Sequence, residues 1–139
     1  MQAFRSLLKY VMPAVVAIML IGLLLSRVIS PDESEGPAEQ ISVYQAENYI
    51  GQRAEVCGRV ASADHVTEIG GSPTFINLDQ PHPDAPFTVV IWEDDRGRWE
   101  SPPEELYANR EICVTGEIDM HEGTPQIVLS DPQNIYIER

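Results

Sequence analysis

Apolar residues recur at every second position in several short stretches after residue 52, which is typical of half-buried β-strands. Groups of Gly, Pro, Asp and Asn separate these stretches and predict turns. In 87–93 nearly every residue is apolar, so this stretch is expected to be covered on both faces. The pattern predicts five strands, which are 53–61, 74–78, 87–93, 111–120 and a closing strand made of 126–129 and 135–137.

Two short helices accompany these strands. The segment 42–50 has apolar residues at near-helical spacing, with Ser42 as N-cap and Gly51 as stop. The segment 101–107 begins with a serine, two prolines and two acids, as helix first turns do. Three strands, a helix and two strands follow the order of an OB-fold. We therefore expect an all-β domain built as a five-stranded OB-fold Greek-key barrel, with a short helix between strands 3 and 4.

The N-terminal hydrophobic pattern is of a different kind. Positions 11–25 form an unbroken run of 15 apolar or small residues, and Lys9 and Arg27 flank it. This length is near the lower limit for a membrane-spanning helix. Basic residues precede the run and acidic residues follow it. The positive-inside bias predicts a transmembrane signal-anchor over 10–29, with 1–9 in the cytoplasm and the C-terminal domain extracytoplasmic, in a periplasm or outside the cell.

The alternative for this segment is a cleaved signal peptide, because a run of this length also suits the core of one. The best cleavage motif, 28–30, is followed by Pro31, which blocks cleavage, so an uncleaved anchor is favoured. The residues 30–41 are acidic and contain Pro and Gly, and they predict a flexible linker. The domain itself is expected over 42–139.

The charge of the chain is strongly acidic, and all of the acids follow the hydrophobic run. The formal net charge is −13, but from position 31 onward six arginines stand against 22 acidic residues, which gives −16. Such a surface repels polyanions at long range and opposes nucleic-acid binding. Solubility, or adaptation to a salty or alkaline exterior, explains the charge without a ligand. Recruitment of a basic partner is the alternative.

The predicted strands also resemble those of a known family. The residues that carry the resemblance are VCGRV at 56–60, FINLD at 75–79, FTVVIW at 87–92 and CVTG at 113–116. Over 46–137 the chain is similar to small bacterial OB-fold domains of the tRNA-anticodon or nucleic-acid-binding type, which are exported or membrane-anchored. The resemblance implies an OB-fold whose ligand is single-stranded nucleic acid or an oligonucleotide.

The resemblance also implies ligand-binding residues. Phe75 matches the second-strand aromatic that stacks on a base, Asn77 the polar residue two positions along, and Arg59 a first-strand basic residue. Stacking tolerates any base and contributes about 1–3 kcal/mol per base. The chain departs from the family at 78–80, where Leu-Asp-Gln lacks the family's arginine, and at 61–64, where basic residues are absent.

A second candidate contact follows the third strand. Arg96, Arg98 and Trp99 form an Arg-Gly-Arg-Trp motif, in which the arginines would clamp phosphates and the tryptophan would stack. The structural alternative is that both arginines pair with the acids at 93–95 on the surface.

The two cysteines predict a disulfide. Cys57 and Cys113 fall on the polar sides of the first and fourth strands, which are antiparallel neighbours in an OB-fold. Outside the cytoplasm such a pair oxidises. Closing a loop of over fifty residues contributes about 4 kcal/mol. The alternative is two small strand residues that never meet.

No residue pattern predicts catalysis. The three histidines, His65, His82 and His121, are scattered over loops without ligand spacing. The acids at 93–95 lack the spacing of a calcium loop, and no serine or cysteine has a nucleophile context. We expect a protein that is not an enzyme and that has no metal site and no cofactor.

Three binding functions remain open. The first is a membrane-anchored module that binds single-stranded nucleic acid. The second is an acidic protein-interaction or scaffold module of the cell envelope with a protein partner, for which the acidity is no handicap. The third is a binder of oligosaccharides or small ligands, because OB-fold faces serve that role too.

Overall fold

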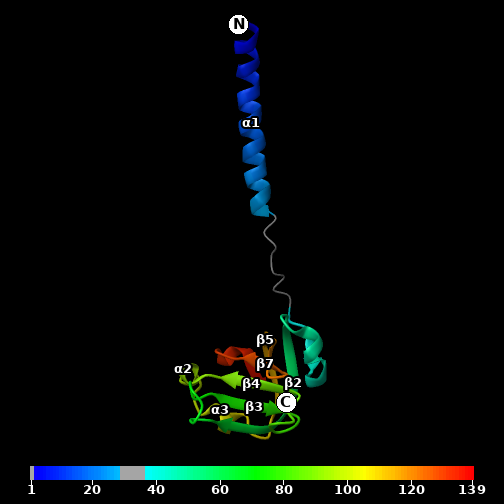
Figure 1. The fold of residues 1–139 in the computed structure, drawn as a ribbon, viewed down its shortest axis with the longest axis vertical. Coiled ribbons are helices and arrows are strands. Elements are labelled where there is room, and N and C mark those ends of the chain that lie inside the picture. The colour runs from blue at the N-terminus through cyan, green and yellow to red at the C-terminus, as the bar shows by residue number, and fades with distance from the viewer. Residues whose placement is uncertain (1, 29–36) are drawn as a thin grey trace. The chain divides into compact units, whose positions relative to one another are not determined.

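The computed structural model describes residues 2–28 and 37–139, which belong to two compact units, Met1–Gly36 and Pro37–Arg139 (Figure 1). Residues 29 and 30 of the cleavage motif and most of the predicted linker lie outside the described residues. The second unit begins at Pro37, and its first strand, β1 (Gln40–Ser42), starts within the range expected to be linker. The folded domain therefore extends further towards the N-terminus than the pattern indicated.

The described residues of the first unit form the helix α1 (Gln2–Val28), which is 27 residues long and includes Pro13. The hydrophobic run lies within this helix. In the part of the chain that the structure describes, no helix has the length and apolar character needed to cross a membrane.

The second unit is mostly β, as predicted, with eight strands instead of five. Three of them, β1, β6 and β8, have only three residues each, too few to give a clear alternating pattern. Its elements after β1 are η1 (Val43–Tyr49), β2 (Arg53–His65), β3 (Thr74–Leu78), β4 (Phe87–Ile91), α2 (Glu93–Arg96), α3 (Pro103–Leu106), β5 (Glu111–Glu117), β6 (Asp119–His121), β7 (Thr124–Val128), η2 (Pro132–Asn134) and β8 (Ile135–Ile137).

The strand β2 organises the sheet because it pairs with two partners along its 13 residues. Its first half is antiparallel to β5 and its second half is antiparallel to β3, with a register shift between Val60 and Ser62. Next to β3 lies β4, which pairs in parallel with β7. Only Ile118 separates β5 from β6, and β6 pairs with β7. Following the pairings from β2 through β3, β4 and β7 to β6, and then the chain from β6 back to β5, leads to β2 again, as in a barrel.

The segment 135–137 is a correction to the sequence analysis. It does not continue the closing strand but forms β8, which pairs antiparallel with β5. The break at Asp131 explains the difference, because its side chain accepts a hydrogen bond of 2.8 Å from the backbone N–H of Gln133 and caps η2. The chain turns there and reaches the opposite edge of β5.

The core lies inside this curved sheet, and the long strands contribute alternate residues to it, whereas all three residues of β6 are exposed. In β3, Ile76 and Leu78 are fully buried, as their phase predicted. Gly116 lets β5 approach β7 closely, since a Cβ there would lie 2.6 Å from Cγ2 of Ile127. Every residue of the main hydrophobic cluster lies between Ile41 and Ile135, so the second unit carries its own core.

The helix predicted between the third and fourth long strands is present as α3. It packs next to a buried aromatic pair, in which the indole N–H of Trp99 donates a hydrogen bond of 3.0 Å to the Tyr107 hydroxyl. Burial raises the pKa of the Tyr107 phenol. The pair anchors the connection between β4 and β5 to the core.

Candidate ligand groove

A groove with a volume of about 870 Å³ crosses the outer face of β3 and β4, the two strands that lie side by side in Figure 1. Its floor comes from residues that alternate with the core residues of these strands. One rim is the loop 66–73 after β2, and the other rims are the loop after β3 and the turn between β6 and β7. The groove is lined by Asp64, Val66, Ile69, Pro73, Phe75, Asn77, His82, Pro83, Thr88, Val90, Trp92, His121, Glu122, Thr124 and Gln126.

One row of the groove floor is polar. Asn77 pairs in register with Ser62 on one side and with Thr88 on the other. Its amide nitrogen donates to Ser62 Oγ at 3.0 Å, and its amide oxygen accepts from Thr88 Oγ1 at 2.9 Å. Thr88 in turn is in register with Gln126 of β7. Asn77 itself is only 4% exposed, so the hydrogen-bonding capacity that this row keeps for a ligand lies with the partly exposed Thr88 and Gln126.

The next row is apolar with an acid at its end. Phe75 is in register with Val90 on β4 and with Asp64 on β2, so these three side chains share the outer face. Phe75 is partly exposed, whereas Val90 is almost inaccessible at 2%. The aromatic ring therefore offers the ligand a platform, and Asp64 is its neighbour on β2 in the groove lining.

Trp92 forms the aromatic wall of the groove and is 40% exposed. The backbone of Gly71 packs against its ring, since a Cβ on Gly71 would lie 3.0 Å from Cε3 of Trp92. Gly71 also has φ of +83°, a conformation that glycine adopts without strain. Its carbonyl accepts a hydrogen bond of 3.2 Å from the Glu93 N–H. These contacts fasten the loop 66–73 to the wall.

Two of the sequence-predicted ligand residues, Phe75 and Asn77, lie together in the groove. Arg59 lies on β2 outside the groove lining. Its guanidinium is 3.7 Å from a carboxylate oxygen of Glu111 on the neighbouring strand. The structure therefore does not bring Arg59 to the aromatic platform.

Arg96 is held in a structural network. Its guanidinium donates two hydrogen bonds to the Glu104 carboxylate, at 2.7 and 3.1 Å, and another to the Thr74 hydroxyl. Its Nε lies 3.5 Å from Glu93, which also contacts His65 at 2.7 Å. Hydrogen bonding from Arg96 lowers the pKa of Glu104. Arg96 thus ties α2, α3 and β3 together.

Arg98 and Trp99 also lie outside the groove lining. Arg98 is 3.5 Å from Asp95 and donates to the Ser130 carbonyl at 3.0 Å. Trp99 is 7% exposed and packs in the core. The stacking role predicted for Trp99 is therefore wrong for this conformation, because the indole is covered by protein and its N–H is bound to Tyr107.

Most of the groove lining was not predicted from the sequence, Trp92 above all. A signal was available, because Thr88, Val90 and Trp92, which directly follows β4, share one phase of the segment while Phe87 and Ile91 take the other. The apolar character of the segment hid this alternation. The rim residues are far apart in sequence and had no such signal.

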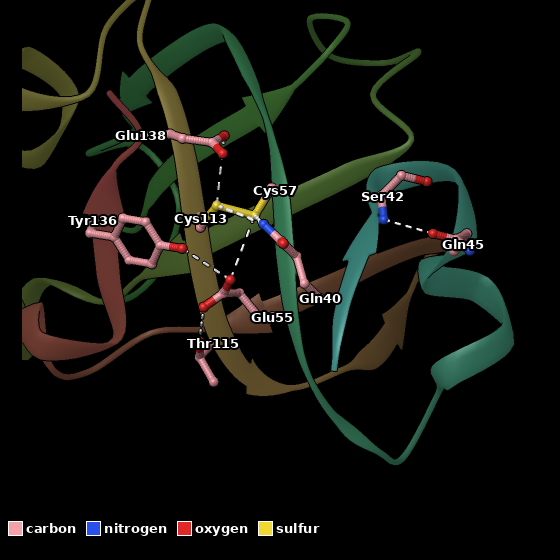
Figure 2. The surroundings of a disulfide bond; sticks show 9 residues. All are labelled: Gln40, Ser42, Gln45, Glu55, Cys57, Cys113, Thr115, Tyr136 and Glu138. Atoms are coloured by element: carbon pink, nitrogen blue, oxygen red, sulfur yellow. Dashed lines mark hydrogen bonds between the residues drawn. A yellow bond between two sulfur atoms is a disulfide. The ribbon is translucent and has the colours of Figure 1, made fainter. Parts of the chain in front are cut away.

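The predicted disulfide between Cys57 and Cys113 is confirmed and lies on the outer face of β2 and β5 (Figure 2). Figure 2 shows Gln40 against the sulfurs, with its side-chain nitrogen 2.9 Å from Cys57 Sγ. Carboxylate oxygens of Glu55 and Glu138 lie 3.9 and 4.0 Å from the Cys57 and Cys113 sulfurs. These neighbours explain why Cys113 is inaccessible although it faces outward.

Glu55 is the centre of the polar contacts around the disulfide. It accepts a hydrogen bond of 3.0 Å from the Tyr136 hydroxyl and one of 3.5 Å from Thr115 (Figure 2). The first of these raises the pKa of Tyr136. In the described part of the chain, the one group of candidate metal ligands is Glu55 with Cys57 and Cys113, and both sulfurs are used in the disulfide.

No family model matches the chain, and no curated protein matches its sequence. Among solved structures, the OBody AM1L10 bound to hen egg-white lysozyme is 18% identical, with a TM-score of 0.47 over 76% of this chain and 98% of its own. The OBody AM3L15 bound to hen egg-white lysozyme is 14% identical, with a TM-score of 0.47 over 75% and 97%. A putative aspartyl-tRNA synthetase from Leishmania major Friedlin is 10% identical, with a TM-score of 0.44 over 78% of this chain and 22% of its own.

Proposed function

We propose that the second unit is an OB-fold binding module whose ligand lies in the groove over β3 and β4. The observation that carries the proposal is the groove itself, with a volume of about 870 Å³, bordered by the loop 66–73 and the turn between β6 and β7. OB-folds bind their ligands on this face and between the equivalent loops. A volume of this size falls in the range of about 300–1,000 Å³ of ligand sites.

The assignment to the OB-fold is supported by the pairing of the five long strands. In chain order the first pairs with the second and the fourth, and the third pairs with the second and, in parallel, with the fifth. The fifth pairs with β6, which extends the fourth. A short helix, α3, precedes the fourth. This is the arrangement that the order of strands and helix predicted.

The charges in and around the groove favour a protein partner over nucleic acid. Phe75 offers a stacking platform for a base, as the resemblance implies. Neutralising phosphate charge, however, takes Lys or Arg, and none occurs among the described residues that line the groove. Asp64 and Glu122, which do line it, repel phosphates. Three of the six arginines that follow position 31, Arg59, Arg96 and Arg98, contact acids elsewhere.

We propose further that the module is tethered to a membrane by the N-terminal segment. This proposal rests on the sequence, on the apolar run 11–25 between Lys9 and Arg27 and on the acids that follow. Extraction of membranes with alkaline carbonate tests it. A tethered chain stays in the membrane pellet, and release into the supernatant contradicts the tether without bearing on the groove.

The groove is tested with residues 37–139, which carry their own core. The probes are a labelled twelve-nucleotide oligothymidylate and a labelled octapeptide, each titrated over a salt series. We expect peptide binding that Phe75→Ala weakens about tenfold and that Tyr44→Ala, an exposed aromatic outside the groove lining, leaves unchanged. If the oligothymidylate bound more tightly than the peptide and its affinity fell steeply with salt concentration, nucleic acid would be the favoured ligand instead.

A further inference from the structure

We propose that the groove recognises an extended polypeptide segment that carries lysine or arginine, with one cationic side chain seated over Phe75 beside Asp64. This inference rests on the proposed function and names its ligand class. It comes from three features of the groove, which are the acid beside the ring, a second acid on the rim and the uncharged polar row of the floor.

The first feature is the position of Asp64 relative to Phe75. The two residues are cross-strand partners in the pairing of β2 with β3, and both line the groove. The Cβ atoms of such partners lie about 5 Å apart on one face of the sheet. A cation over the face of the Phe75 ring gains the attraction of the π-system, and the carboxylate beside it adds to that attraction.

The second feature is Glu122, in the turn between β6 and β7. It is exposed, and it lines the groove on a different rim from Asp64. Its backbone has φ of +49°, so a tight turn sets its position. The lining holds carboxylates from two separate elements and two histidines, of which His121 lies 4.0 Å from the Glu122 carboxylate, but no Lys or Arg among the described residues, so the groove favours a cationic chain over an anionic one.

The third feature favours a polypeptide over a small cation. The row formed by Asn77, Thr88 and Gln126 runs across the floor, and its partly exposed members, Thr88 and Gln126, carry a hydroxyl and an amide without charge. Such groups match the N–H and C=O groups of an extended peptide backbone. The aromatic side chains and acids then select the side chains that the backbone carries.

The test compares three labelled octapeptides of one sequence that contain three lysines, three acetylated lysines or three glutamates. Each is titrated by fluorescence anisotropy into residues 37–139 at low salt. We expect the lysine peptide to bind and the acetylated peptide to bind at least about tenfold more weakly, since acetylation removes the charge and keeps the length. No binding of the lysine peptide, or equal binding of the acetylated one, would overturn the proposal.

Charge-removing variants separate the groove from the general acidity of the domain. Asp64→Asn with Glu122→Gln is compared with Glu100→Gln with Glu105→Gln, which removes the same charge at exposed sites outside the groove lining. We expect the groove pair to weaken the lysine peptide by about tenfold and the control pair by less than about twofold. Equal losses would show attraction to the whole surface and would overturn the inference.

The variant Phe75→Ala distinguishes failure of this inference from failure of the proposed function. If Phe75→Ala weakens all peptides and the acid variants change nothing, the groove is the site but its ligand is not selected for charge. If Phe75→Ala changes no titration, the groove is not the site, and both proposals fall. The inference stands when Phe75→Ala and the groove acid pair both weaken the lysine peptide.

Discussion

Phe75 and Ile76 are consecutive residues of β3 that face opposite sides of the sheet. Phe75 lies partly exposed in the groove, and Ile76 is fully inaccessible in the core. This separation places ligand binding and stability on neighbouring positions of one strand, so the two roles can be tested independently.

Alanine substitutions at these two positions are expected to affect different quantities, peptide affinity at Phe75 and stability at Ile76. Phe75→Ala removes the groove platform, so peptide affinity falls about tenfold while the free energy of unfolding changes by less than about 1 kcal/mol. Ile76→Ala leaves a cavity in the core and costs about 2–5 kcal/mol of stability. Urea unfolding and peptide titration of both variants measure the two effects. A large stability loss in Phe75→Ala would mean that the ring is part of the core.

Trp99→Phe is expected to affect stability alone. The substitution removes the indole N–H that donates to Tyr107 and leaves a buried hydroxyl without this partner. Such a loss costs about 1–3 kcal/mol. Chemical denaturation detects it, and ligand titration is expected to match the wild type. If Trp99→Phe weakened binding and left stability unchanged, the stacking role predicted from the sequence would be restored.

Opening the Cys57–Cys113 disulfide is expected to destabilise the domain without altering the groove. The bond joins residues 56 positions apart, and the loop-entropy model assigns about 4 kcal/mol to a loop of that length. Unfolding of Cys57→Ala with Cys113→Ala, compared with the oxidised wild type, measures the loss. Ligand affinity serves as the control, because neither cysteine lines the groove. A stability change below about 1 kcal/mol would contradict the expectation.

Lowering the pH is expected to remove the contribution of the Arg96–Glu104 pair to the free energy of unfolding. The pKa of Glu104 lies below its ordinary value of 4.5 because Arg96 donates hydrogen bonds to the carboxylate. A carboxyl group whose pKa is lower in the folded than in the unfolded state stabilises the fold at pH values above its unfolded-state pKa. This stability is lost as the pH falls through the folded-state pKa. The wild type is therefore expected to exceed Glu104→Gln in stability at neutral pH, with a difference that shrinks below pH 4.5.

The control for this pH dependence is the adjacent exposed acid. Glu105→Gln is expected to leave the difference from the wild type nearly constant across the same series of urea unfolding curves, because Glu105 lies outside the ion pair. If the stability difference between the wild type and Glu104→Gln followed the same pH dependence as that for Glu105→Gln, the Arg96–Glu104 pair would not be a source of pH-dependent stability.

The sequence predicted those parts of the fold that depend on local pattern. The alternation of Ile76 and Leu78 with Phe75 and Asn77 identified the two faces of β3, and the phases of the cysteines led to the disulfide. Of the three short strands, β1 was not predicted, and β6 and β8 were predicted only as parts of longer strands, because a strand of three residues such as β8 is defined by its partner more than by its own sequence.

The groove could be predicted only in part for a related reason. Its floor residues follow strand phase, but Glu122 and the loop 66–73 meet there through the pairing of distant strands. The burial of Trp99 depends on its contact with Tyr107, eight residues further along the chain. A sequence motif such as Arg-Gly-Arg-Trp carries no information about that contact, so its aromatic residue looked available for stacking.

The two tryptophans provide the most direct test of the central claim that the ligand lies across β3 and β4. Trp92 lines the groove at 40% exposure, and Trp99 is buried at 7%. In ¹⁵N-labelled residues 37–139, each gives one indole N–H signal, which Trp92→Phe assigns. Addition of the lysine octapeptide is expected to shift the Trp92 signal and leave the Trp99 signal in place. A bound peptide that shifts neither indole, and moves only signals around Cys57 and Cys113, would contradict the account.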